Sequence, residues 1–107
     1  MAAVLAYGDL KKLELAVALA NDPEVLLLDE PTAGMAPAER GALMALTERI
    51  ARERRLTVLF TEHDMDVVFA VADRIMVLHQ GRVIAEGRPA EVRADAQVQR
   101  VYLGDDE

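Results

Sequence analysis

The segment Val25–Glu30, VLLLDE, restricts the fold of this chain more than any other stretch of its 107 residues. Four consecutive apolar residues run into two adjacent carboxylates, and Pro31 ends the run. A continuous apolar run of this length is typical of a strand buried on both faces, as in a parallel sheet with helices on both sides. The sequence therefore predicts such a strand, with Asp29 and Glu30 at its carboxyl end.

Helical and strand-like patterns alternate along the rest of the chain. The expected helices span about residues 9–20, 37–55 and 64–72, and the expected strands span residues 24–29, 56–61, 74–79 and 82–86. Apolar residues at helical spacing predict the buried faces of these helices: Leu13, Ala16, Val17 and Ala20; Leu43, Leu46 and Ile50; Met65, Val68, Phe69 and Ala72.

This order of elements predicts an α/β fold with right-handed parallel crossovers. Gln80-Gly81 is expected to form a tight turn that makes the last two strands an antiparallel hairpin. Pro89 is expected to open a helical tail, with Asp95 capping its last turn and Gly104 ending it. No linker is apparent, so residues 1–107 are expected to form a single domain with an acidic tail at 105–107.

Four polar residues follow the two predicted parallel strands: Asp29, Glu30, Glu62 and His63. The carboxyl ends of such strands form the usual ligand crevice of an open α/β sheet. An Asp there can hold Mg²⁺ through water, and the next Glu can activate an attacking water. Two simpler interpretations remain open: a solvated strand end, and a surface histidine. A further alternative is a hydrolytic metal centre made by Asp29, Glu30, His63 and Asp64.

The stretch Leu5–Ala16, LAYGDLKKLELA, is a second candidate site. Gly8 is expected just before a helix start, where exposed N–H groups can bind an anion. Lys11 and Lys12 add positive charge in the first turn, where it opposes the helix dipole. A glycine turn with two solvated lysines is an equally good interpretation.

The charge and composition exclude several classes of function. Nineteen acids against 12 bases give a net charge of −7, which argues against nonspecific nucleic-acid binding because no basic excess displaces counterions. Cysteine is absent, so there is no thiol chemistry. No apolar run approaches the roughly 20 residues that span a bilayer, and no signal peptide is evident. A cytoplasmic protein is expected, with any membrane contact peripheral.

These stretches, taken together, resemble the ATP-binding subunit of ABC transporters. LAYGD (Leu5–Asp9) is similar to the signature motif, VLLLDE (Val25–Glu30) to Walker B and AGMAP (Ala33–Pro37) to the D-loop, with His63 as the switch histidine. The stretch Asp73–Gly87 is also typical of the family, and the resemblance covers residues 5–104. The YGD, PTAGM and VYLG segments most resemble subunits of branched-chain amino-acid importers.

The resemblance implies a role for each matching residue. Asp29 would position Mg²⁺ through water, Glu30 would be the general base for ATP hydrolysis, and His63 would contact the γ-phosphate. The signature residues would face ATP held by a second ATPase subunit, paired head to tail: Ala6, Tyr7, Gly8 and Asp9. Ala6 stands where the family usually has serine, so its hydroxyl contact to phosphate is lost here. The D-loop has Gly34, Met35 and Ala36 in place of the common Ser-Ala-Leu-Asp sequence.

No G-x-x-x-x-G-K-[ST] phosphate loop occurs in the 107 residues. The resemblance therefore implies a partial P-loop NTPase-type (RecA-like) sheet without its phosphate-loop strand, in the C-terminal part of an ATPase. The missing strand would expose the edge of residues 56–61, which then either pairs with the hairpin or causes self-association. The chain alone is expected to be inactive, and a non-enzymatic module pairing with a full-length subunit is the alternative. In the full-length ATPase that the resemblance implies, permease subunits would hold the ATPase at the inner face of the membrane.

Overall fold

The computed structural model describes residues 7–102 and, from residue 9 onward, their side chains. The chain divides into two compact units, residues 1–63 and residues 64–107, each of which is described by itself. The expectation of a single domain over residues 1–107 stays a prediction. Among the described residues, no helix combines the length and the apolar character needed to cross a membrane.

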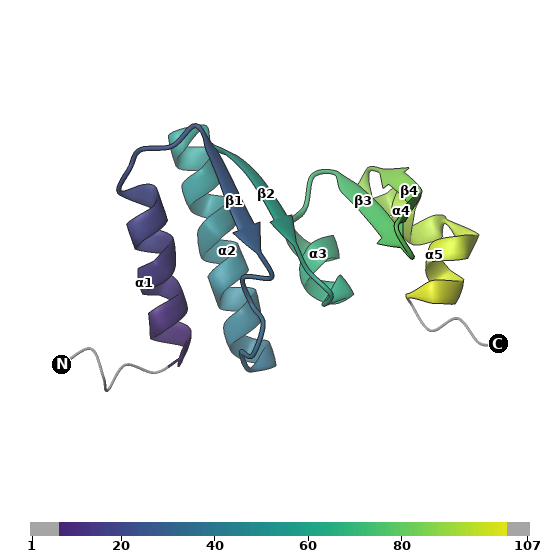
Figure 1. Cartoon of the computed structure of the whole chain (residues 1–107), viewed down its shortest axis with the longest axis horizontal. Helices are drawn as coiled ribbons and strands as arrows, with labels where there is room; N and C mark the ends of the chain where they lie inside the picture. The colour runs from purple at the N-terminus through teal and green to yellow at the C-terminus, as the bar shows by residue number, and fades with distance from the viewer. Residues whose placement is uncertain (1–6, 103–107) are drawn as a thin grey trace. The chain divides into compact units, whose positions relative to one another are not determined.

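The described residues of the first unit form two helices and a two-stranded parallel sheet (Figure 1). Its elements in chain order are α1 (Tyr7–Leu19), β1 (Val25–Asp29), α2 (Pro37–Arg54) and β2 (Thr57–Thr61). The two strands pair in register from Val25 opposite Thr57 to Asp29 opposite Thr61, so both end at the same level. The predicted α/β class with a parallel crossover is therefore confirmed.

The ends of α2 follow from local sequence. Ala36 has an extended backbone and Pro37 occupies the first helical position, where a missing N–H removes no helical hydrogen bond. Glu39 lies in the first turn, and Arg52 and Arg54 lie in the last, each favourable for the helix dipole. The chain then turns at Arg55, which adopts a left-handed conformation and donates its N–H to carbonyls of the last turn.

The core of the first unit lies between the helices and one face of the sheet. Its buried residues are Leu15, Leu19, Leu26, Met35, Leu43 and Leu56. The prediction that residues 24–29 are buried on both faces is wrong within the described chain, because Leu27 is 69% exposed and Leu59 of β2 is 64% exposed. Both helices pack on the face that carries Leu26, and no described element of this unit covers the other face.

The predicted buried face of α1 is also wrong. Leu15 and Leu19 are buried, whereas Leu13 and Val17 are exposed. The helix carries apolar residues on more than one side, so spacing alone did not distinguish the side that meets the sheet.

The predicted stripe of α2 is confirmed at Leu43, which is joined there by the buried residues Met44 and Thr47.

Up to residue 102, the second unit is a hairpin packed with three short helices. Its elements in chain order are α3 (Met65–Val71), β3 (Ile75–His79), β4 (Arg82–Gly87), α4 (Pro89–Ala94) and α5 (Ala96–Val101). Gln80 and Gly81 both have positive φ, as a two-residue type I′ hairpin turn requires. Asp95 caps α5 as predicted, while Gly104 lies outside the described residues. Among the described residues the hairpin forms a two-stranded sheet, and its alternative pairing with the strand at residues 56–61 stays a prediction.

The core of the second unit is small. Ile75, Val77, Val92 and Val98 are its buried residues. The Arg93 guanidinium lies 4.3 Å from the centre of the Phe69 ring, a cation–π contact that joins α4 to α3. After α5, the Tyr102 hydroxyl donates a hydrogen bond to the Leu78 carbonyl, which holds the end of the described chain on the hairpin.

Adjacent leucines of β1 provide a direct test of the one-sided core. We predict that Leu26→Ala lowers the free energy of unfolding by about 2–5 kcal/mol, because it leaves a cavity at a residue that is 5% exposed. Leu27→Ala is the matched control and should change it by less than about 0.5 kcal/mol, since that side chain faces solvent. Urea titration followed by circular dichroism measures both, and equal losses would contradict the one-sided arrangement.

Candidate functional site

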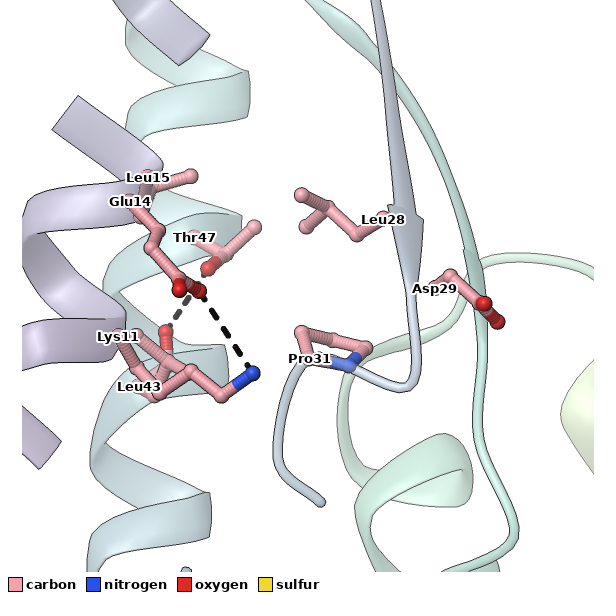
Figure 2. A pocket seen from close by; sticks show the side chains of 8 residues that line it. All are labelled: Lys11, Glu14, Leu15, Leu28, Asp29, Pro31, Leu43 and Thr47. Carbon is pink, nitrogen blue, oxygen red and sulfur yellow. Dashed lines mark hydrogen bonds and ion pairs between the residues drawn. The ribbon is translucent and has the colours of Figure 1, made fainter. Parts of the chain in front are cut away.

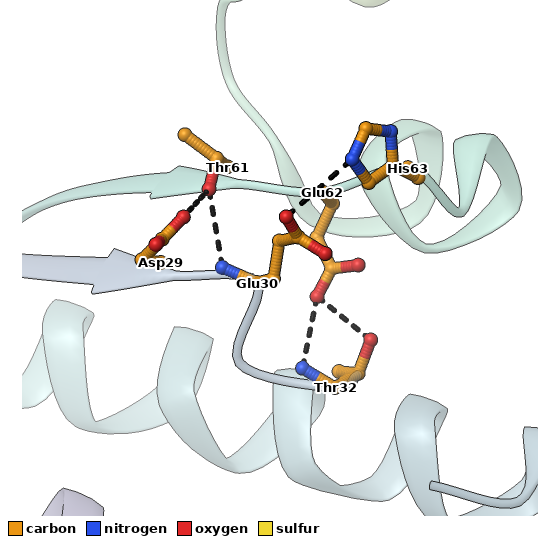
Figure 3. Close-up of polar contacts among 6 residues, drawn as sticks. All are labelled: Asp29, Glu30, Thr32, Thr61, Glu62 and His63. Atoms are coloured by element: carbon orange, nitrogen blue, oxygen red, sulfur yellow. Dashed lines mark hydrogen bonds and ion pairs between the residues drawn. The ribbon is translucent and has the colours of Figure 1, made fainter. Parts of the chain in front are cut away.

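The candidate site lies at the carboxyl ends of β1 and β2 (Figure 3). Asp29 is the last residue of β1 and pairs with Thr61, the last residue of β2. Because the strands are parallel and end at the same level, the residues that follow them also lie side by side. Glu30 and His63, which are 33 positions apart in the sequence, are thereby brought into contact.

The hydroxyl of Thr61 joins the two strand ends. It donates a hydrogen bond of 2.7 Å to Asp29 Oδ1 and accepts one of 3.1 Å from the backbone N–H of Glu30. The same N–H also lies 3.0 Å from the carbonyl oxygen of Thr61. These bonds fix the direction of the Asp29 carboxylate and the start of the turn that follows β1.

Glu30 has a left-handed backbone conformation, with φ of 46°. This conformation costs a residue with a side chain of order 1–3 kcal/mol and persists only where surrounding contacts enforce it. It is also unusual directly before a proline such as Pro31, where extended conformations are preferred. Glu30 has therefore left the strand geometry, and its side chain direction is set by the turn and not by strand alternation.

The turn directs the Glu30 carboxylate toward His63. Glu30 Oε2 lies 3.4 Å from His63 Nε2, and the His63 side chain is 82% exposed (Figure 3). A contact this exposed adds little to stability, because water screens it. The pair leaves a carboxylate and an imidazole together at the open end of the sheet, where they can act on a bound molecule.

A second pair of residues lies directly beneath this contact. The backbone N–H of Thr32 donates a 3.0 Å hydrogen bond to Glu62 Oε2, and the Thr32 hydroxyl donates one of 2.7 Å to the same oxygen. Thr32 is 2% exposed. The sequence had indicated Glu62 only by its place after a strand, and it gave no role to Thr32 or Thr61.

The D-loop stretch Ala33–Pro37 leads from the site into α2. The Ala33 N–H donates to the Glu30 carbonyl, and the Met35 N–H donates to the Thr32 carbonyl, so successive turns shape the segment. Gly34 has φ of 81°, a conformation that glycine adopts readily. Met35 is buried, and its carbonyl accepts a 2.9 Å hydrogen bond from Arg40 Nε.

The signature stretch lies at the start of α1. The helix begins at Tyr7, so Gly8 lies inside its first turn and not before it as predicted. Asp9 is exposed in the same turn, and Ala6 lies outside the described residues. Lys11, a predicted anion ligand, has a largely buried side chain whose Nζ lies 3.6 Å from Glu14 Oε1.

A pocket of about 90 Å³ lies between α1, α2 and the end of β1 (Figure 2). Lys11 and Asp29 both line it, so the start of α1 and the end of β1 border the same space. Its volume is well below the roughly 300–1,000 Å³ of a typical ligand pocket. Lys12 lines a smaller pocket of about 70 Å³ together with Asp9 and Glu39, acidic neighbours that disfavour an anion there.

The proposed alternative of a metal centre built from Asp29, Glu30, His63 and Asp64 finds no geometric support. Within the described part of the chain, no three or more His, Asp or Glu side chains are grouped so as to hold a metal ion. The Asp64 carboxylate instead caps α3, where it accepts hydrogen bonds from the backbone N–H groups of Asp66 and Val67. Asp29 and Glu30 direct their carboxylates to different partners, Thr61 and His63.

Comparison with known proteins relates this geometry to a family. The ABC transporter family matches residues 1–33, and the C-terminal family of branched-chain amino acid ATP-binding cassette transporters matches residues 82–107. The high-affinity branched-chain amino acid transport ATP-binding protein LivG of Salmonella typhimurium is 44% identical over 101 residues, which cover 94% of this chain. BraF of Pseudomonas aeruginosa, with the same description, is 41% identical over 97% of this chain.

Over nearly its whole length, the chain is similar to ATP-binding proteins of ABC transporters. It spans about 40% of the length of LivG and 41% of BraF. Among solved structures, cbiO1 of Clostridium perfringens is 38% identical with a TM-score of 0.80, over 91% of this chain and 39% of that one. An ABC transporter cassette in its ADP conformation is 31% identical with a TM-score of 0.82, over 95% of this chain and 41% of its own.

These matches confirm the resemblance to branched-chain amino-acid importer ATPases that the sequence indicated. They also confirm the P-loop NTPase-type fold class, since the solved structures are ABC ATPase domains. The two family matches include the signature and Walker B stretches at one end and β4 with the helical tail at the other.

Proposed function

We propose that this chain carries the water-activating part of an ABC-type transport ATPase. The observation that supports the proposal is the contact between Glu30 and His63 at the carboxyl ends of paired parallel strands. In this role Glu30 is the general base, which accepts a proton from the water that attacks the γ-phosphate. His63, whose imidazole is exposed beside it, contacts the γ-phosphate.

Asp29 is suited to position Mg²⁺ through water. One oxygen of its carboxylate accepts the Thr61 hydroxyl, which fixes the group at the exposed strand end. Carboxylate oxygens are ligands that Mg²⁺ accepts directly or through water, and the ion when bound would neutralise charge that develops on the phosphoryl group. Asp29 alone would hold the ion only through water, since no cluster of acids surrounds it within the described residues.

The remaining roles concern partners. Ala6, Tyr7, Gly8 and Asp9 would face ATP held by a second ATPase subunit, and Ala6 would offer it no hydroxyl. ATP hydrolysis would drive import of a small solute, and the relatives LivG and BraF favour branched-chain amino acids. Permease subunits would hold the assembly at the cytoplasmic face of the membrane, and no nucleic acid would take part.

The 107 residues contain no phosphate-loop pattern, so hydrolysis would depend on a loop outside them. The alternative proposal follows from the same fact. The chain would then be a non-enzymatic module that pairs with a full-length ATPase subunit and presents its signature residues to that subunit's ATP.

A chimera tests the catalytic proposal. We predict that LivG of Salmonella typhimurium, with its matching 101-residue region replaced by this chain, hydrolyses ATP while the chain alone does not. Glu30→Gln should lower kcat of the chimera about 10²–10⁴-fold with little change in KM, because it removes the general base.

The matched control is Glu53→Gln, which makes the same change of charge on an exposed residue in the last turns of α2. It should leave kcat unchanged. Hydrolysis that survives Glu30→Gln would refute the role of Glu30. A chimera that folds and pairs with LivG but hydrolyses nothing would favour the non-enzymatic module.

We further propose that the chain alone self-associates through β2. Within the described residues, β2 pairs only with β1, and its exposed Leu59 adjoins the exposed Leu27. An open strand edge beside an apolar face favours pairing with another chain.

Light scattering over a range of concentrations tests this association. The average mass should rise with concentration, and Leu59→Lys should suppress the rise. Val83→Lys is the control, because Val83 is a similarly exposed apolar residue on the hairpin. A monodisperse monomer at every concentration would rule the association out.

A further inference from the structure

The two hydrogen bonds from Thr32 to Glu62 have no part in the chemistry proposed above. Both donors of Thr32, the backbone N–H and the hydroxyl, converge on the single oxygen Glu62 Oε2, at 3.0 and 2.7 Å. The acceptor is a carboxylate, so both bonds are charge-assisted and stronger than bonds between neutral groups. Thr32 is 2% exposed, which shields these bonds from competing water.

The positions of the two residues relate this pair to the candidate site. Thr32 lies two residues after Glu30, and Glu62 lies directly before His63. The pair therefore ties the turn after β1 to the end of β2, just beyond the last paired residues of the two strands. A displacement of either partner would separate the Glu30 carboxylate from the His63 imidazole.

Glu30 is held from both sides by such bonds. Before it, Thr61 accepts the Glu30 N–H through both its carbonyl and its hydroxyl oxygen. After it, Glu62 holds Thr32. A left-handed backbone at Glu30 needs enforcement of this kind, because the conformation is unfavourable for a residue with a side chain.

The direction of Glu62 also matters for His63. Figure 3 shows the Glu62 carboxylate turned toward Thr32, while the Glu30 carboxylate faces the imidazole. Thr32 thus holds the Glu62 carboxylate by hydrogen bonds. Glu62 lies next to His63 in the sequence, and its carboxylate could otherwise compete with Glu30 for the His63 ring.

We propose that Thr32 and Glu62 are positioning residues, whose paired hydrogen bonds set the Glu30 carboxylate and the His63 imidazole at contact distance. The inference rests on the proposed function for its catalytic meaning. The geometry that it asserts, however, exists without nucleotide and can be measured separately.

Nuclear Overhauser effects in the full 107-residue chain, without nucleotide, test the geometry. The wild-type chain should give a cross-peak between the His63 ring and the Glu30 side chain. Thr32→Val should weaken it, because the hydroxyl donor is lost, and Glu62→Ala should abolish it. Thr32→Ser restores the hydroxyl and should restore the cross-peak.

Thr47→Val is the matched control. Thr47 is the other buried threonine of the described chain, and its hydroxyl donates to the Leu43 carbonyl within α2, away from His63. This variant loses a buried hydroxyl too, yet it should leave the cross-peak at its wild-type intensity. A cross-peak that fades equally in Thr47→Val, or that survives Glu62→Ala, would overturn the proposal.

Glu62→Gln and Thr32→Ser are conservative variants that keep the test decisive if the larger changes prevent folding. Glu62→Gln preserves an acceptor of the same size without the charge, so it should weaken the cross-peak less than Glu62→Ala.

In the LivG chimera, Thr32→Val should lower kcat with KM unchanged, and Thr32→Ser should recover it. A chimera without any hydrolysis would refute the proposed function, while the cross-peaks would still decide the positioning role.

Discussion

The parallel pairing of β1 with β2 is the constraint on which the rest of the first unit depends. Its register places Asp29 opposite Thr61, so two segments more than 30 residues apart end at one level. A slip of one residue would turn every side chain of a strand to the opposite face. It would bring Leu27 into the core in place of Leu26 and would move Glu30 out of reach of His63. Core packing and site geometry therefore rest on the same register.

The candidate site combines rigid support with exposed functional groups. Thr32 is buried and bonded through both donors, and Thr61 is bonded to both Asp29 and Glu30. The His63 ring above them is mostly exposed. This division suits a site that must hold its groups in place while leaving them accessible to a ligand, and it explains why a strained Glu30 backbone is tolerated.

The sequence predicted most elements because their signals are local. Pro37 and Arg55 mark the ends of α2, Asp95 caps α5, and Gln80-Gly81 makes the hairpin turn. Motif order also predicted the family. Burial was harder to predict, since α1 has apolar residues on several sides and the run Val25–Leu28 reads as fully buried whichever of its faces is covered.

The supporting contacts of the site could not be predicted, because they depend on tertiary geometry. Thr32 and Glu62 are 30 residues apart, and nothing in their local sequence indicates that they meet. The left-handed backbone of Glu30 was equally hidden, since the proline after it favours extended conformations. A polar residue at the end of each buried strand was the one available signal, and it located the site without its internal arrangement.

A structure of the LivG chimera carrying Glu30→Gln, with MgATP bound, tests the central claim most directly. We predict that the side chain at position 30 contacts the attacking water and the His63 imidazole contacts the γ-phosphate, with the two side chains still adjacent and Thr32 still bonded to Glu62. A γ-phosphate bound away from both side chains, or a His63 ring turned away from position 30 in the nucleotide-bound state, would contradict it.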